Sequence, residues 1–125
     1  MNISVRAEGE VTVVSPAGEI STGGGGLARP LGLRGDPLID LSETLRTILN
    51  DGVRWILLDL DQVRFLDSAG LGELVACYKR AIQKGGDIRL MRPSAKVREL
   101  LEMTGLVRVF RVFTDETEAL DSFRA

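Results

Sequence analysis

The chain has 125 residues, of which 44% are hydrophobic and 27% charged, and its formal net charge is −2. This length and composition indicate one globular domain with a sizeable buried core. The charge balance argues against nucleic-acid binding, because proteins that neutralise phosphates carry surplus lysine and arginine. No uncharged apolar run approaches the roughly 20 residues that cross a bilayer, so we expect no direct membrane insertion.

Histidine is absent, and Cys77 is the single cysteine. The chain therefore lacks the residues of Ser-His and Cys-His nucleophiles and of nearly all zinc sites, and it can form no internal disulfide. The first residues, MNISVRAEGE, lack the apolar core of a signal peptide, which favours a reduced intracellular protein. The spacing of the acidic residues singles out no catalytic pair. We expect no catalytic residue, no metal site and no cofactor.

The N-terminal third predicts a β-hairpin followed by a long connection. Residues 3–8 alternate apolar and polar positions, and residues 11–20 open with the β-branched run VTVV, so two strands would pair through a turn at Gly9. Ser15 and Pro16 predict a bend in the second strand. Residues 21–36 contain six glycines and predict a mobile loop. This loop has no lysine, and Pro30 interrupts the position of a phosphate-binding helix, which argues against a nucleotide fingerprint.

From residue 36 onward, apolar spacing predicts alternating helices and strands. The helices are expected over 36–52, capped by Asp36 or Asp40, and over 68–85, 93–105 and 115–123, and the strands over 53–60, 87–91 and 107–113. Such alternation implies parallel strands joined by right-handed crossovers, onto which the hairpin pairs. The predicted fold is α/β, with a mixed β-sheet of four to five strands and helices packed mainly on one face.

The segment FLDSAG, residues 65–70, is expected at the carboxyl edge of the sheet, where functional sites of open α/β sheets lie. Asp67 and Ser68 could each cap the following helix. A helix N-terminus stabilises an anion by roughly 0.3–1 kcal/mol, so the fold would tolerate a phosphate on Ser68, whereas a docked partner would have to desolvate it. Simple capping by Ser68 stays open, and Gly70 and Gly72 could merely allow tight packing on the sheet.

Three stretches carry a resemblance to a known family. They are GEI at 18–20, DSAGL at 67–71 with its glycine-terminated helix, and MTGL at 103–106. In this order they resemble the anti-sigma factor antagonist family of STAS domains over the whole chain except the glycine-rich loop. The resemblance implies a single STAS domain over residues 1–125, with a loop insertion at 21–36.

The resemblance also implies a bacterial cytoplasmic switch with no catalytic activity of its own. In that family an anti-sigma factor that is also a serine kinase phosphorylates the serine matching Ser68, and a serine phosphatase removes the phosphate. The unphosphorylated form binds the anti-sigma factor and frees the sigma factor for transcription. The implied phosphoacceptor is Ser68, and the implied partner-binding residues are Ser21, Asp67, Ala69, Gly70 and Leu71. Ser21 stands where family members usually have aspartate.

Two other functions stay open from the sequence. STAS domains also serve, without phosphorylation, as scaffolds or accessory subunits of signalling and lipid-transport complexes. A third hypothesis is small-molecule sensing, with the glycine-rich loop as a lid.

Overall fold

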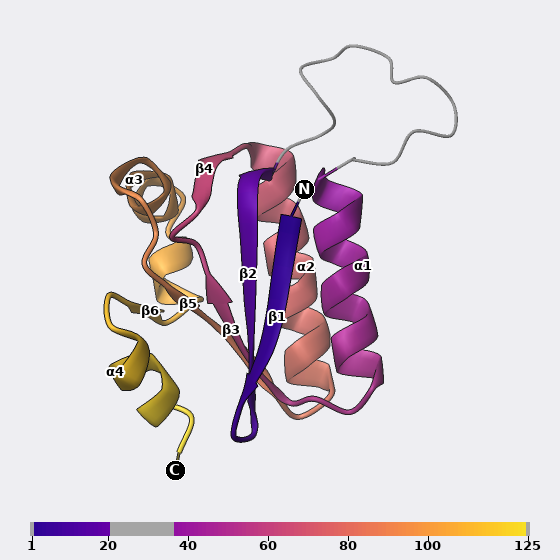
Figure 1. Cartoon of the computed structure of the whole chain (residues 1–125). Coiled ribbons are helices and arrows are strands. Elements are labelled where there is room, and N and C mark those ends of the chain that lie inside the picture. Colours follow the sequence, from indigo (N-terminus) through magenta and orange to yellow (C-terminus); the bar gives the residue numbers. More distant parts are fainter. Residues whose placement is uncertain (1, 21–36, 125) are drawn as a thin grey trace, which may run out of the picture.

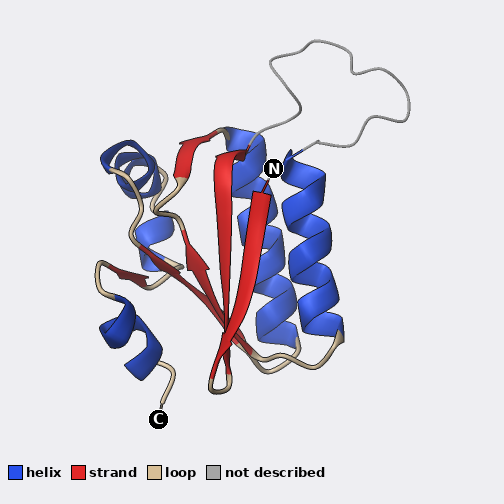
Figure 2. Cartoon of the chain, viewed as in Figure 1, coloured by secondary structure: helices blue, strands red, loops and turns tan. Residues whose placement is uncertain are grey.

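The fold is built on a mixed β-sheet (Figure 2). The computed structural model describes residues 2–20 and 37–124. β1 runs antiparallel to β2, and all other pairs are parallel, in the order β1-β2-β3-β5-β6 with β4 paired to β2. The predicted hairpin and mixed sheet are confirmed. The strands are β1 (Asn2–Glu8), β2 (Val11–Ile20), β3 (Trp55–Asp59), β4 (Val63–Leu66), β5 (Asp87–Met91) and β6 (Val112–Phe113).

The second strand, β2, changes its partner along its length. Its first residues pair with β3 and its last three, Gly18–Ile20, pair with β4, with a register shift after Gly18. Gly18 has a φ of 117°, a conformation that favours glycine. Pro16 lies between the two paired stretches, where its missing N–H costs no bond to either parallel neighbour. Beyond this irregular stretch, the end of β2 lies beside the end of β4.

The helices are α1 (Pro37–Asn50), α2 (Ser68–Gln83), α3 (Ala95–Met103) and α4 (Glu116–Asp121). Figure 1 shows α1 and α2 side by side against one face of the sheet, with α4 on the other side. The larger core joins α1, α2 and α3 to that first face, and a smaller cluster lies beneath α4 around Val13, Leu57 and Met91. The predicted packing of helices mainly on one face is therefore confirmed. Among the described helices, none combines the length and the hydrophobicity of a transmembrane span.

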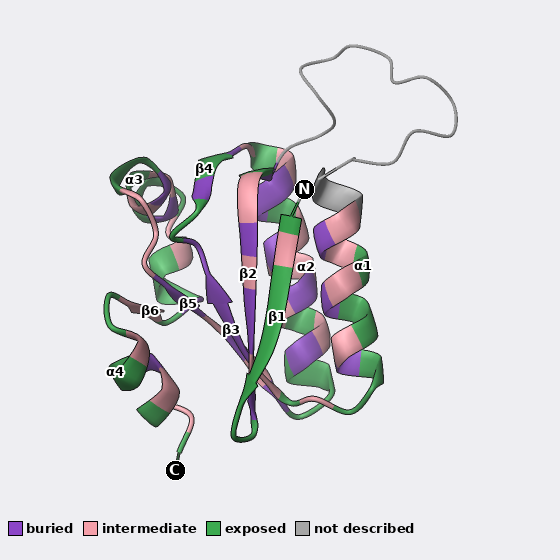
Figure 3. Cartoon of the chain, in the orientation of Figure 1, coloured by how far each residue is buried: buried purple, intermediate pink, exposed green. Residues whose placement is uncertain are grey.

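Burial follows the position of each strand in the sheet (Figure 3). The central strand β3 is buried over Ile56–Asp59, as its near-continuous apolar sequence predicts, whereas the edge strand β1 is exposed at all but one position.

Two helices begin at caps that the sequence predicts. Ser94 Oγ accepts the Val97 N–H at 3.2 Å, and Asp115 Oδ2 accepts the Glu118 N–H at 3.0 Å. Asp36 and the predicted loop at 21–36 lie outside the described residues.

The predicted strand over residues 107–113 is largely wrong. This segment begins within a 3₁₀ turn, Leu106–Arg108, and only Val112–Phe113 form a strand. Gly105, with a φ of 76°, follows the end of α3, and the Phe110 N–H donates to the Leu106 carbonyl at 2.9 Å. The turn buries Phe110, whose ring centroid lies 5.2 Å from that of Tyr78. The alternating pattern therefore belongs to a turn that inserts an aromatic ring into the core.

The strand β4 was missed by the sequence prediction. Its four residues, VRFL, are buried only at the two ends, a pattern that matches neither strand alternation nor a continuous apolar run. With β4 the described part of the chain has six strands, in place of the four to five expected. The ladder between β4 and β2 sets Leu66 opposite Ile20, immediately before α2 begins.

Cys77 of α2 offers a test of this core. Its side chain is 1% exposed, and burial, assisted by the charge of Glu73, raises the pKa of the thiol from 9.0 to about 11. The native thiol should therefore resist a disulfide reagent at pH 8 and react rapidly once guanidinium unfolds the chain. Because the unfolded thiol ionises first, the free energy of unfolding should fall between pH 9 and about 11 more steeply than in Cys77→Ala. Fast reaction of the native thiol at pH 8 would contradict this packing.

Candidate functional site

The carboxyl ends of β2 and β4 meet the N-terminus of α2 at one edge of the sheet (Figure 1). Ile20 lies opposite Leu66, and the Asp67 N–H donates to the Ile20 carbonyl at 3.3 Å. Asp67 then leads directly into α2, which begins at Ser68. This is the carboxyl edge at which the sequence placed the segment FLDSAG, and parallel α/β sheets commonly hold their functional groups there.

Of the two candidate caps, Asp67 is the N-cap of α2. Its backbone is extended, with a φ of −97° and a ψ of −178°, and its Oδ1 accepts the Gly70 N–H at 2.8 Å. The Asp67 carbonyl also accepts the Leu71 N–H at 2.9 Å, which begins the helical hydrogen bonding. A carboxylate in this position satisfies a first-turn amide and complements the positive end of the helix dipole.

Ser68 is the first residue of α2 and is exposed. Because Asp67 occupies the cap position, capping by Ser68 is not its role in this structure. Its hydroxyl makes no hydrogen bond with any residue that the structure describes. The residue therefore combines solvent access, an available hydroxyl and the electropositive end of a helix.

Gly70 fixes the distance between the first turn of α2 and the end of β2. A Cβ atom at this position would lie 2.4 Å from the Ile20 carbonyl oxygen and 2.7 Å from Leu66 Cδ1, closer than real atoms approach. Gly72, about half a turn further on and exposed, has nothing within 4 Å of a Cβ atom. The packing explanation of the glycines therefore holds for Gly70 and fails for Gly72.

The structure places the other predicted partner-binding residues in two groups. Asp67 and Ala69 are half-buried beside the exposed Ser68, whereas Gly70 and Leu71 are buried. The buried pair holds the turn in place and presents no side chain at the surface, so a part in partner binding stays a prediction for all of them. Ser21 lies outside the described residues.

An ion pair between the buried Asp59 and the partly exposed Arg92, at the carboxyl ends of β3 and β5, was missed by the sequence analysis. Asp59 is 8% exposed, and its Oδ2 accepts from Arg92 Nη2 at 3.0 Å and from Ser15 Oγ at 3.3 Å. The hydrogen bond from Arg92 raises the pKa of that guanidinium. The signal in the sequence was an aspartate ending the apolar run WILLD. With Ser15, the pair connects three chain segments.

Within the described ranges, no group of acidic, Cys or His side chains could hold a metal ion.

The sequence profile of the STAS domain matches residues 39–119, and the chain belongs to this family. It is 37% identical over 65 residues to an anti-sigma F factor antagonist of Paenibacillus polymyxa, a match that covers 52% of this chain and 56% of that protein. It is 33% identical over 73 residues to an anti-sigma-B factor antagonist of Staphylococcus aureus, covering 58% of this chain and 68% of that one. The match thus spans little more than half the length of the Paenibacillus relative.

Solved structures confirm the predicted STAS fold. An anti-sigma factor antagonist from Mycobacterium paratuberculosis superposes with a TM-score of 0.78 at 23% identity, covering 99% of this chain and 94% of that one. The unphosphorylated form of the anti-sigma factor antagonist SpoIIAA gives a TM-score of 0.75 at 19% identity, covering 98% and 96%. The fold is thereby shared almost end to end.

The two α2 glycines provide a matched test of the site. Gly70→Ala should destabilise the chain by about 1–3 kcal/mol, because the added methyl group collides with the Ile20 carbonyl. Gly72→Ala should stabilise it by about 0.4–1 kcal/mol, because its surroundings are open and alanine restricts the unfolded chain. Urea unfolding of both variants measures the difference. Equal stability of the two variants would contradict the close approach at Gly70.

Proposed function

We propose that this chain is an anti-sigma factor antagonist controlled by phosphorylation of Ser68. In the unphosphorylated form it binds an anti-sigma factor that is also a serine kinase, and it thereby frees a sigma factor for transcription. Phosphorylation of Ser68 by that partner ends the complex, and a serine phosphatase restores the binding form. The names of the Paenibacillus and Staphylococcus relatives support the antagonist role.

The observation that carries the proposal is that Asp67 and Ser68 have different roles at the start of α2. Asp67 caps α2, which leaves the exposed Ser68 hydroxyl available for modification at the helix N-terminus. SpoIIAA, which shares the fold, has been solved in both an unphosphorylated and a phosphorylated form. A fold of this type therefore accommodates a phosphorylated state.

A phosphate at Ser68 would act on binding more than on folding. It adds about −1.5 to −2 charges beside the Asp67 carboxylate, and the positive end of α2 offsets part of the resulting repulsion. A partner that covers this surface would have to remove water from the phosphate and from Asp67 together. The modification therefore weakens the complex while leaving the domain folded.

The proposed contact surface consists of Asp67, Ser68 and Ala69, with Gly70 and Leu71 holding the first turn of α2 in position, and Ser21, which the family resemblance adds, lies outside the described residues. Ser68 serves as a substrate of the partner and has no role as a nucleophile, because the chain has no histidine to activate it. The protein accordingly has no catalytic activity of its own under this proposal.

Phosphorylation of single variants tests the proposal. The purified anti-sigma factor kinase from the same genome, with ATP, should add one phosphate to the wild-type chain and none to Ser68→Ala, as measured by intact-mass spectrometry. Ser4→Ala is the matched control, because Ser4 is also exposed but lies on β1. This control should accept the phosphate at the wild-type rate. Labelling that persists in Ser68→Ala would refute the assignment of the phosphoacceptor.

A further inference from the structure

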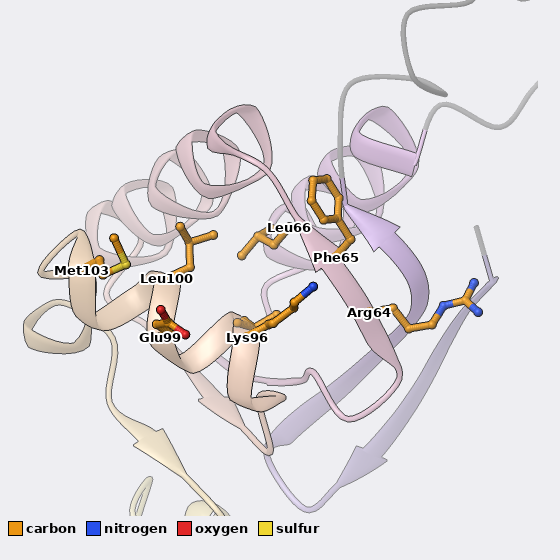
Figure 4. Close-up of a pocket in the computed structure, with 8 residues that line it drawn as sticks. Arg64, Phe65, Leu66, Lys96, Glu99, Leu100 and Met103 are labelled. Atoms are coloured by element: carbon orange, nitrogen blue, oxygen red, sulfur yellow. The ribbon is translucent and has the colours of Figure 1, made fainter.

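A groove with a volume of about 340 Å³ lies between β4 and α3 (Figure 4). Phe65 and Leu66 of β4 form one side, and Val97, Leu100 and Met103 of α3 form the other. We name this feature the β4–α3 groove. Its volume is at the lower end of the range for small-molecule pockets, about 300–1,000 Å³, so it suits a few apolar side chains.

The walls of the β4–α3 groove expose two large apolar side chains. Phe65 is 49% exposed and Met103 is 76% exposed, while Leu66 and Val97 beneath them are buried. Solvent exposure of neighbouring apolar side chains over a hollow is typical of an interaction surface. Methionine adapts its shape to different contacts, which suits Met103 to a docking role.

The β4–α3 groove is continuous with the proposed contact surface at Ser68. Leu66 lines the groove and is followed directly by Asp67 and Ser68, so roughly 7 Å of extended chain separates the two features. A stable protein complex usually covers about 800 Å² on each partner, far more than one helical turn provides. A partner seated on Ser68 needs additional surface, and this groove is adjacent.

Charge around the β4–α3 groove indicates the kind of segment that would occupy it. Its lining includes the charged residues Arg64, Lys96 and Glu99, and Figure 4 shows the Arg64 side chain directed away from α3. Figure 4 shows Lys96 extending from α3 toward β4. An amphipathic helix with two or three apolar side chains on one face and an acidic residue placed to reach Lys96 would match both the apolar walls and this cation.

We propose that the β4–α3 groove binds an apolar, acid-flanked helix of the same anti-sigma factor that contacts Ser68. This inference rests on the proposed function and adds a second contact to it. The groove supplies apolar contact, and Ser68 sets the charge at the adjoining surface. The partner therefore meets the chain at both places in the unphosphorylated form.

Titration calorimetry with the purified anti-sigma factor kinase tests this contact. Met103→Ser should raise the dissociation constant about tenfold or more, because the substitution removes an exposed apolar contact and leaves the core untouched. Ile82→Ser is the matched control, since Ile82 is 48% exposed and lies at the far end of α2. This control should bind within about twofold of wild type. Lys96→Glu should weaken binding, and Lys84→Glu should leave it unchanged.

Three outcomes would overturn the inference, each in a different way. Unchanged affinity of Met103→Ser, with Ser68 still phosphorylated by the same kinase, rejects the groove contact and leaves the proposed function intact. Absence of any binding or phosphorylation of the wild-type chain rejects the proposed function and the groove contact together. A wild-type dimer in sedimentation that Met103→Ser dissociates shows that the groove holds a second copy of this chain.

Discussion

The close approach of Gly70 to the Ile20 carbonyl is the constraint on which the site depends. Glycine at this position lets the first turn of α2 lie directly on the end of β2, at a distance that no Cβ atom permits. The same contact allows the Asp67 N–H to donate to Ile20 and the Asp67 side chain to cap the helix. Ser68 is then held at the surface by the buried contacts of its neighbours.

This arrangement separates stability from recognition within a few residues. Asp67, Gly70 and Leu71 make backbone or core contacts, and Ser68 makes no hydrogen bond with the described residues. A change of charge at Ser68 therefore has little to disrupt inside the domain. Under the proposed function, its effect falls on whatever covers the surface, where a desolvated phosphate is costly.

The sequence predicts those parts of the fold that depend on local patterns. The spacing of apolar residues locates α2, Gly9 locates the hairpin turn, and capping rules narrow the N-cap of α2 to Asp67 or Ser68. Residues 107–113 mislead because their alternation resembles a strand, although Phe110 turns into the core. β4 is not predicted, because its four residues, VRFL, form neither a regular alternation of apolar and polar residues nor a continuous apolar run.

The site is predictable only where its residues are contiguous. Asp67 and Ser68 stand side by side in the sequence, so helix capping rules alone single them out. The β4–α3 groove combines residues about thirty positions apart, and the pair of Asp59 and Arg92 joins the ends of two strands. Such contacts depend on the order of the strands and on the strand β4. The local sequence pattern predicts neither of these.

The most direct test of the account compares Ser68→Asp with Ser68→Asn, which have the same shape and differ in charge. Calorimetry should show that the aspartate variant binds the anti-sigma factor kinase at least about tenfold more weakly than the asparagine variant. Urea unfolding should give the two variants free energies within about 1 kcal/mol of each other, because the charge lies at a helix N-terminus. Equal affinities, or a loss of binding accompanied by unfolding of the aspartate variant, would contradict a switch that acts at the surface.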